Sequence, residues 1–148
     1  MIEIEFADQQ QTLSVDKRRL EQAARLILHD HGPETVHLSV AVVDDATIHE
    51  LNRQFLQHDY PTDVLSFLLE NEAERMEGEV IVSADTARAQ AERLGVRADD
   101  ELLLYLIHGV LHLVGFDDRS PRRRERMRRA ERQYMEQCGI CDHVWRVP

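Results

Sequence analysis

The chain has 148 residues, of which 43% are hydrophobic, and it carries a formal net charge of −10. This length is typical of one domain, which we expect to span residues 1–148. The acidic balance excludes a protein that coats nucleic acid through general positive charge. No apolar run approaches the roughly 20 residues of a membrane span, and the acidic N-terminus lacks the features of a signal peptide. We therefore expect a cytoplasmic protein without a membrane partner.

Hydrophobic periodicity divides the chain into strands and helices, because side chains repeat every two residues in a strand and about every 3.6 residues in a helix. In chain order, the expected elements are strands at 2–6, 36–43, 64–69 and 78–83, with helices at 15–30, 46–56, 84–94, 98–114 and 121–137. The charged residues 70–77 are expected to form a loop between the last two strands. We expect these two strands to pair antiparallel as a hairpin.

Short polar side chains stand before several of these helices, as is typical of N-caps. The expected caps are Ser14, Asp44 or Asp45, Ser83 and Ser120. The last helix is dense in arginine, with eight arginines between Arg119 and Arg132. This local positive charge within an acidic chain is compatible with steering an anionic substrate to one face.

Two histidines lie one turn apart near the end of the apolar helix 98–114. Because residues four apart share a helix face, His108 and His112 can point at one place. Gly115 can turn the chain after the helix and bring Asp117 or Asp118 back toward the histidines. Two imidazoles and a carboxylate with an open fourth position are typical of a catalytic zinc site. Two buried imidazoles without partners would cost a few kcal/mol, so a metal explains them better than a purely structural role.

A metalloprotease is an alternative, because the same segment is similar to the pattern H-E-x-x-H-x-x-G-x-x-H/D. Position 109 is glycine here, so the general base of those proteases is missing. The zincin-like alternative therefore lacks one catalytic group.

Cys138 and Cys141 form a C-x-x-C pair near the C-terminus, with His143 nearby. The further ligands of a structural zinc site are not evident in the sequence. The strand–helix context of a thioredoxin-like motif is also missing. We therefore expect two reduced thiols.

Three ordered segments resemble the bacterial rRNA-maturation endoribonucleases of the YbeY family. Residues 108–118 are similar to H-G-x-L-H-L-x-G-[YF]-D-H, residues 51–67 to L-N-x-x-[YF]-R-x-x-D-x-P-T-D-V-L-S-F, and residues 78–83 to G-D-I-x-I-S. The order of elements matches over essentially the whole chain. The resemblance implies an α+β fold, with a four-stranded, mostly parallel mixed sheet packed with about five helices and a metal site on a central buried helix. The first two strand–helix–strand passages are long enough for right-handed crossovers.

The resemblance also implies a metal-dependent endoribonuclease that cleaves single-stranded RNA in rRNA maturation and ribosome quality control. Its partners would be single-stranded RNA, rRNA or a ribosomal subunit. His108, His112 and Asp118 would hold one Zn²⁺ per chain, which could activate water or polarise the scissile phosphate. Asp117 is a candidate for orienting a histidine, or an alternative ligand.

Several further side chains are candidates for contacting RNA near this site. They are Thr62, Asp63, Ser66, Arg122, Arg123 and Arg126. Asp63 and Ser66 cannot point to the same side of one regular strand. The alternative for the arginines is a solvated face that also carries Glu125 and Glu131.

Two positions depart from the family pattern. The third ligand is histidine in the family and Asp118 here, and this extra negative charge favours harder ions such as Mn²⁺. Leu56 stands where the family has an arginine implicated in activity, and leucine cannot bind phosphate. Arg53, three residues earlier on the same helix face, is the candidate catalytic substitute. A third alternative follows, a ribosome-associated metal-binding module that has lost catalysis.

Overall fold

The computed structural model describes residues 1–141 and 143. Its elements in chain order are β1 (Ile2–Asp8), α1 (Lys17–His31), β2 (Thr35–Val43), α2 (Asp45–Leu56), β3 (Val64–Asn71), β4 (Arg75–Ser83), α3 (Ala84–Leu94), α4 (Ala98–Leu113) and α5 (Pro121–Gln137). Within these residues the predicted α+β fold, with four strands in one sheet and five helices, is confirmed.

The predicted caps are confirmed at three helices and wrong at one. The side chains of Asp44, Ser83 and Ser120 each accept a hydrogen bond from a backbone N–H in the first turn of α2, α3 and α5. At α1 the cap is Asp16 and not Ser14, because the Asp16 carboxylate accepts from the N–H of Arg19 at 3.3 Å. The helix therefore begins at Lys17, later than the Ser14 cap predicted.

The charged segment 70–77 is mostly strand, which corrects the predicted loop. β3 continues to Asn71 and β4 begins at Arg75, with Asn71 paired to Met76. Met76 is buried in the core, and the ladder satisfies the backbone groups of its charged neighbours. Tertiary pairing overrides the local preference of a charged segment for a loop.

The sheet has the strand order β1-β2-β4-β3. β2 runs parallel to β1 and to β4, whereas β3 runs antiparallel to β4. The antiparallel hairpin is confirmed, and so is the mostly parallel mixed sheet. The predicted crossover through α2 is wrong, because β3 lies at the edge beyond β4 and runs antiparallel to it.

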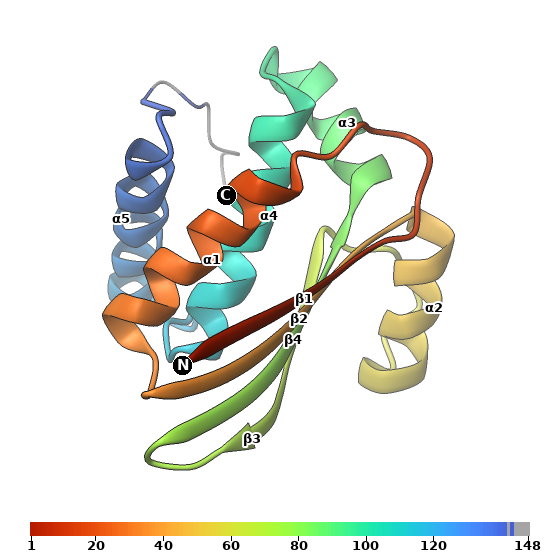
Figure 1. Ribbon diagram of the computed structural model, residues 1–148. Coiled ribbons are helices and arrows are strands. Elements are labelled where there is room, and N and C mark those ends of the chain that lie inside the picture. The colour runs from red at the N-terminus through yellow and green to blue at the C-terminus, as the bar shows by residue number, and fades with distance from the viewer. Residues whose placement is uncertain (142, 144–148) are drawn as a thin grey trace.

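The helices cover the sheet unequally (Figure 1). α1, α4 and α5 lie on one side of the sheet and α2 lies on the other. Alternate residues of β2 are buried in the larger core beneath α1 and α4: Val36, Leu38, Val40 and Val42. α4 contacts α1, α3, α5, β3 and β4, so it is the central buried helix that the sequence predicted. Although α4 is strongly apolar, none of the described helices has both the length and the apolar character needed to cross a membrane.

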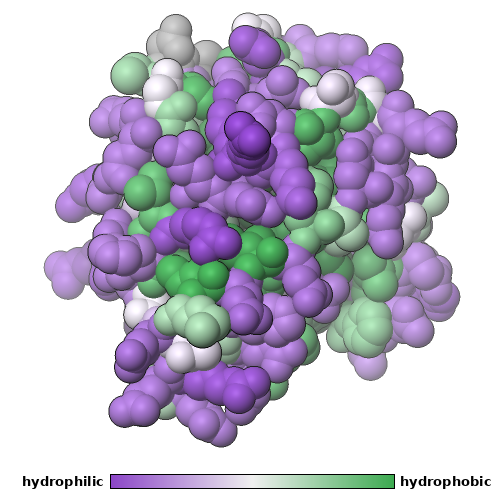
Figure 2. Space-filling model, viewed as in Figure 1, coloured by the Kyte–Doolittle hydropathy of each residue, from purple (hydrophilic) through white to green (hydrophobic). Residues whose placement is uncertain are grey.

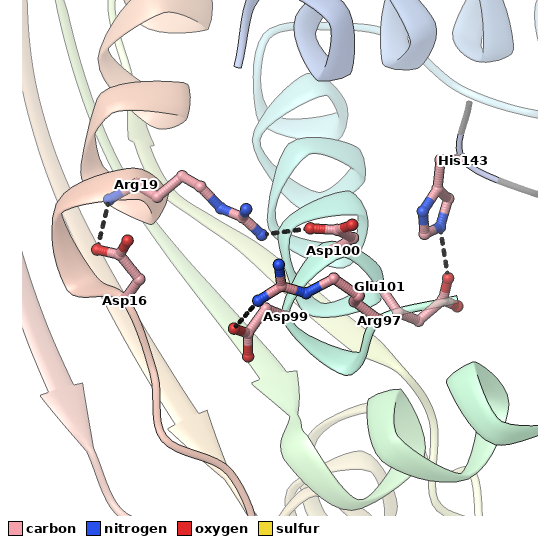
Figure 3. A network of polar contacts seen from close by, with 7 residues as sticks. All are labelled: Asp16, Arg19, Arg97, Asp99, Asp100, Glu101 and His143. Atoms are coloured by element: carbon pink, nitrogen blue, oxygen red, sulfur yellow. Dashed lines mark hydrogen bonds and ion pairs between the residues drawn. The ribbon is translucent and has the colours of Figure 1, made fainter. Parts of the chain in front are cut away.

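Charged contacts hold the first turn of α4 to distant parts of the chain (Figure 3). Arg19 of α1 pairs with Asp100 at 2.9 Å. Nε2 of His143, beyond α5, lies 2.8 Å from Oε1 of Glu101, and both side chains are buried. Carboxylates in a first helical turn also interact favourably with the helix dipole. These pairs attach α1 and His143 to the central helix.

Replacing His143 with alanine is expected to lower the free energy of unfolding by about 1–3 kcal/mol, because Glu101 would lose this partner while remaining buried. Urea denaturation monitored by circular dichroism measures the change. The double variant Glu101→Leu, His143→Ala is expected to recover part of the loss, since no buried carboxylate remains at this position. Equal stability of His143→Ala and the original chain would contradict the structural role of the pair.

Candidate metal centre

The backbone of α4 packs directly against the sheet at Gly109. A Cβ atom added there would lie 2.7 Å from Cγ1 of Val80 and 2.9 Å from Cγ2 of Val64. The hydroxyl of Ser66 in β3 donates to the carbonyl oxygen of Gly109 at 2.9 Å. This close approach fixes the helix beside β3 and β4. It thereby sets the positions of His108 and His112 on the neighbouring helix faces.

His108, His112 and Asp118 come together as the sequence predicted. One ligand atom from each side chain lies within 4.8 Å of the other two. Nε2 of His112 lies 3.0 Å from Nε2 of His108, so both rings direct the same nitrogen to one place. Two imidazole nitrogens and a carboxylate oxygen are a suitable donor set for a divalent ion of the zinc type. The residues present therefore fit a metal ion.

The turn after α4 selects between the two candidate carboxylates. Gly115 has φ of 105°, a conformation that glycine adopts without strain. The Asp117 carboxylate accepts from the N–H of Arg119 at 3.1 Å and from Arg123 at 3.2 Å. Asp118 belongs to the group of converging ligand atoms, whereas Asp117 is occupied by its arginine neighbours. The geometry therefore favours Asp118 as the ligand.

Glu131 is a site residue that the sequence analysis did not identify, since it named Glu131 only as part of the alternative solvated face of the last helix. Only 6% of its surface is exposed, and its Oε2 lies 3.3 Å from Nδ1 of His108. A carboxylate that accepts from Nδ1 orients the ring and leaves Nε2 available to a metal. The sequence contained a signal for this residue, because Glu131 continues the inward stripe formed by Met127, Ala130 and Tyr134.

Replacing Glu131 with glutamine is expected to weaken metal binding about 10–100-fold, because an amide orients the His108 ring less strongly and adds no basicity to it. Competition with a chromogenic chelator measures the affinity. Glu125→Gln is the matched control, since Glu125 is exposed on the same helix and pairs with Arg129. Equal metal affinities of the Glu131 and Glu125 variants would rule out this role for Glu131.

The two histidines have different electrostatic environments. Burial lowers the pKa of His108, but the hydrogen bond and charge of Glu131, with the charges of Asp63 and Asp118, outweigh it, so the net pKa is raised. Burial and the neighbouring charge of His108 lower the pKa of His112. His112 is therefore favoured as the neutral imidazole, which is the form that binds metal.

Asp63 lies within electrostatic range of the site, while Ser66 serves the packing of α4. Asp63 precedes β3, so the alternation of a regular strand does not restrict its direction. Thr62 donates from its hydroxyl to the Asp63 carboxylate at 3.3 Å. Asn52, a buried residue of α2, donates to the carbonyl oxygen of Tyr60 and holds the loop that leads to Asp63. Sequence reasoning did not identify this support.

The structure separates the candidate arginines into different settings. Arg53 pairs with Glu50 on the exposed side of α2, and within residues 1–141 and 143 no contact joins it to the metal ligands. Arg123 pairs with Asp117 beside the site. The guanidinium of Arg126 lies 4.9 Å from the centre of the Phe116 ring. Arg122 is exposed on the first turn of α5.

Comparison with known proteins identifies one family. A family model described as "Endoribonuclease YbeY" matches residues 5–139. The "Endoribonuclease YbeY" of Rhodopirellula baltica is 46% identical over 130 residues, which cover 86% of this chain and 67% of that protein. The protein of the same name from Desulfitobacterium hafniense is 39% identical over 132 residues, covering 82% and 84%. A solution structure of TM1509 from Thermotoga maritima has a TM-score of 0.64 and 29% identity, covering 91% of this chain and 88% of that one.

Proposed function

The chain belongs to the Endoribonuclease YbeY family, and from that membership we propose that it is a metal-dependent endoribonuclease that cleaves single-stranded RNA in rRNA maturation. The observation that carries the proposal is the convergence of His108, His112 and Asp118 at the end of α4. Glu131 behind His108 supports it, because buried carboxylates commonly orient metal-binding imidazoles.

Zn²⁺ is the ion that we propose for the site, with Mn²⁺ as an alternative. A divalent ion held by His108, His112 and Asp118 would supply Lewis acidity for phosphodiester hydrolysis. Asp118 in place of the family's histidine makes the site more negative, and a carboxylate ligand favours harder ions. Comparing activity in Zn²⁺ and Mn²⁺ after metal stripping therefore tests the identity of the ion.

The remaining candidate residues have two proposed roles: some contact RNA, and others hold the metal ligands in position. Asp117 is a positioning residue, because its contacts with Arg119 and Arg123 hold the loop that presents Asp118. Thr62 and Asp63 lie in the loop that precedes β3, and the charge of Asp63 acts on His108. We propose both as substrate contacts, together with Arg122, Arg123 and Arg126. Arg53 remains the proposed substitute for the family arginine, and a phosphate there would compete with Glu50.

The contact at Gly109 argues against a metalloprotease. Those enzymes place their general base at this position, beside the first histidine. Here the position faces Val64 and Val80 at distances that leave no room for a side chain. The missing glutamate is therefore a consequence of how α4 packs on the sheet.

Incubation of the metal-loaded chain with a labelled single-stranded rRNA fragment and, separately, with casein tests the proposal. We expect cleavage of the RNA alone, loss of cleavage after chelation, and recovery when Zn²⁺ or Mn²⁺ is restored. Cleavage of casein would support the protease instead. Binding to ribosomal subunits without RNA cleavage would support the metal-binding module that has lost catalysis.

A further inference from the structure

Large hydrophobic side chains come to the surface where α2 ends and the loop to β3 begins. The exposed fraction is 60% for Phe55, 44% for Leu56 and 53% for Tyr60. Three of the six large hydrophobic side chains that are exposed among the described residues therefore lie in this short segment. Figure 2 shows hydrophobic residues at the surface on the right, the side on which Figure 1 places α2. Exposed apolar groups that gather in one segment typically mark a binding surface.

Two rings in this loop, those of His58 and Tyr60, stack on each other. Their centroids are 5.4 Å apart and their planes differ by 10°, which is an offset parallel arrangement. Each ring covers one face of the other, and both residues are exposed, so the outer faces are open to a ligand. A planar nucleobase is a ligand that can extend such a stack, because every base has a π-face.

Hydrogen bonds from α2 hold the backbone that carries this ring stack. The buried side chain of Asn52 donates from Nδ2 to the carbonyl oxygen of Tyr60 at 2.9 Å. The carbonyl oxygen of Asn52 accepts from the N–H of His58 at 3.2 Å. Both ring-bearing residues are thus anchored to one residue of the helix. A ring stack that is already ordered loses less conformational freedom when a ligand binds.

The acidic side chains next to the ring stack have contacts within the chain. The Asp59 carboxylate lies 2.8 Å from Nε2 of His49, and Glu50 pairs with Arg53. These contacts offset part of the negative charge that would repel RNA. Leu56, which stands where the family has an arginine, adds apolar area to the segment and no phosphate contact. The surface is therefore better suited to bases than to phosphates.

The loop leads from the ring stack to the candidate metal centre. Tyr60 is three residues before Asp63, so their Cα atoms are at most about 11 Å apart. The charge of Asp63 acts on His108. Val64, the next residue, packs against α4 at Gly109, beside His108. A strand with a phosphate at the metal centre can therefore reach the ring stack within a few nucleotides.

We infer that the ring stack of His58 and Tyr60 binds an unpaired base of the RNA strand whose reacting bond lies at the metal centre. This base-stacking site rests on the proposed function for the identity of the strand. Aromatic side chains bind RNA in this way when a base is unstacked from its neighbours and splayed out. The site adds a contact to a base, away from the metal, to the contacts proposed with phosphates.

Tyr60→Ala tests the site, with Tyr60→Phe as the variant that keeps the ring. The probes are two fluorescein-labelled single strands of 2′-O-methyl RNA, one with all its bases and one with abasic residues at its centre. Fluorescence anisotropy gives the Kd of each for the metal-loaded full chain. Loss of one stacking ring should weaken binding of the first strand about 5- to 150-fold and leave binding of the abasic strand unchanged. Tyr60→Phe should bind both strands like the original chain.

Salt dependence and a second variant separate stacking from other causes. Tyr60→Ala removes no charge, so the slope of log Kd against log salt should not change. Leu69→Ala is the matched control, since Leu69 is 60% exposed and has no ring. Equal weakening by Leu69→Ala, or an equal loss with the abasic strand, would overturn the site, because general apolar contact would explain it. Unchanged binding in Tyr60→Ala would also overturn it and would favour a protein partner for the exposed rings.

Cleavage assays separate a failure of the base-stacking site from a failure of the proposed function. In Tyr60→Ala we expect a higher KM for single-stranded RNA and an unchanged kcat, because the ring contributes to binding and not to the reacting bond. If the original chain cleaves RNA and Tyr60→Ala has the same KM, the site is wrong and the nuclease stands. If the original chain cleaves no RNA, the nuclease fails and the anisotropy measurements alone decide the site. An original chain that binds neither strand would overturn the site as well.

Discussion

His112→Ala is expected to reduce RNA cleavage by about a thousandfold, because a metal ion contributes several kcal/mol of charge stabilisation and each 1.4 kcal/mol is a factor of ten. The variant should also lose stoichiometric metal, since only one imidazole and one carboxylate of the group would remain. Single-turnover cleavage of labelled RNA gives the rate, and elemental analysis gives the metal content.

His29→Ala is the control for this substitution, since the His29 side chain is 85% exposed near the end of α1. It should keep both the metal and the activity. RNA cleavage that survives in His112→Ala at the original rate would contradict the metal-dependent mechanism. Lost metal with retained cleavage would assign the ion to stability instead of catalysis.

The second large effect is expected at Gly109, where alanine should lower the free energy of unfolding by about 1–3 kcal/mol through overpacking. The added Cβ would lie 2.7 Å from Cγ1 of Val80, and the better helix propensity of alanine offsets only part of this cost. Glutamate at the same position should be worse, because its carboxylate would be buried between valines. Urea denaturation measures the stability of each variant.

A double-mutant cycle with Val80→Ala tests the cause of this effect. Val80→Ala removes the methyl group closest to the added Cβ, so Gly109→Ala should cost less in that background than in the original chain. Strictly additive effects would show that the close approach of α4 to β4 does not limit the residue at position 109. The same result would reopen the question of why the protease glutamate is missing.

Much of the fold could be predicted from sequence because its signals are local. The limits of α3 and α5 follow from serine caps and from the apolar stripe of each helix, and both were predicted correctly. The placement of β3 at the sheet edge was not predictable in this way. It depends on which strand pairs with β2, and a hydrophobic pattern contains no information about strand order.

In the candidate site, too, some features could be predicted from the sequence and others could not. The convergence of His108 and His112 was predictable, because four residues on one helix fix their relative positions. The contact of Glu131 with His108 joins residues 23 positions apart on two helices, so it needed the packing of α5 on α4.

The sequence by itself determined the elements, the family resemblance and the histidine pair, because caps, periodicity and spacing act over a few residues. The family resemblance favoured Asp118 over Asp117, and the tertiary structure places Asp118 beside the histidines. The tertiary structure alone decided that Glu131 contacts His108. It also showed that α4 approaches β3 and β4 closely at Gly109. These features depend on contacts between segments that are distant in the chain, and such contacts exist only after the helices and the sheet have packed together.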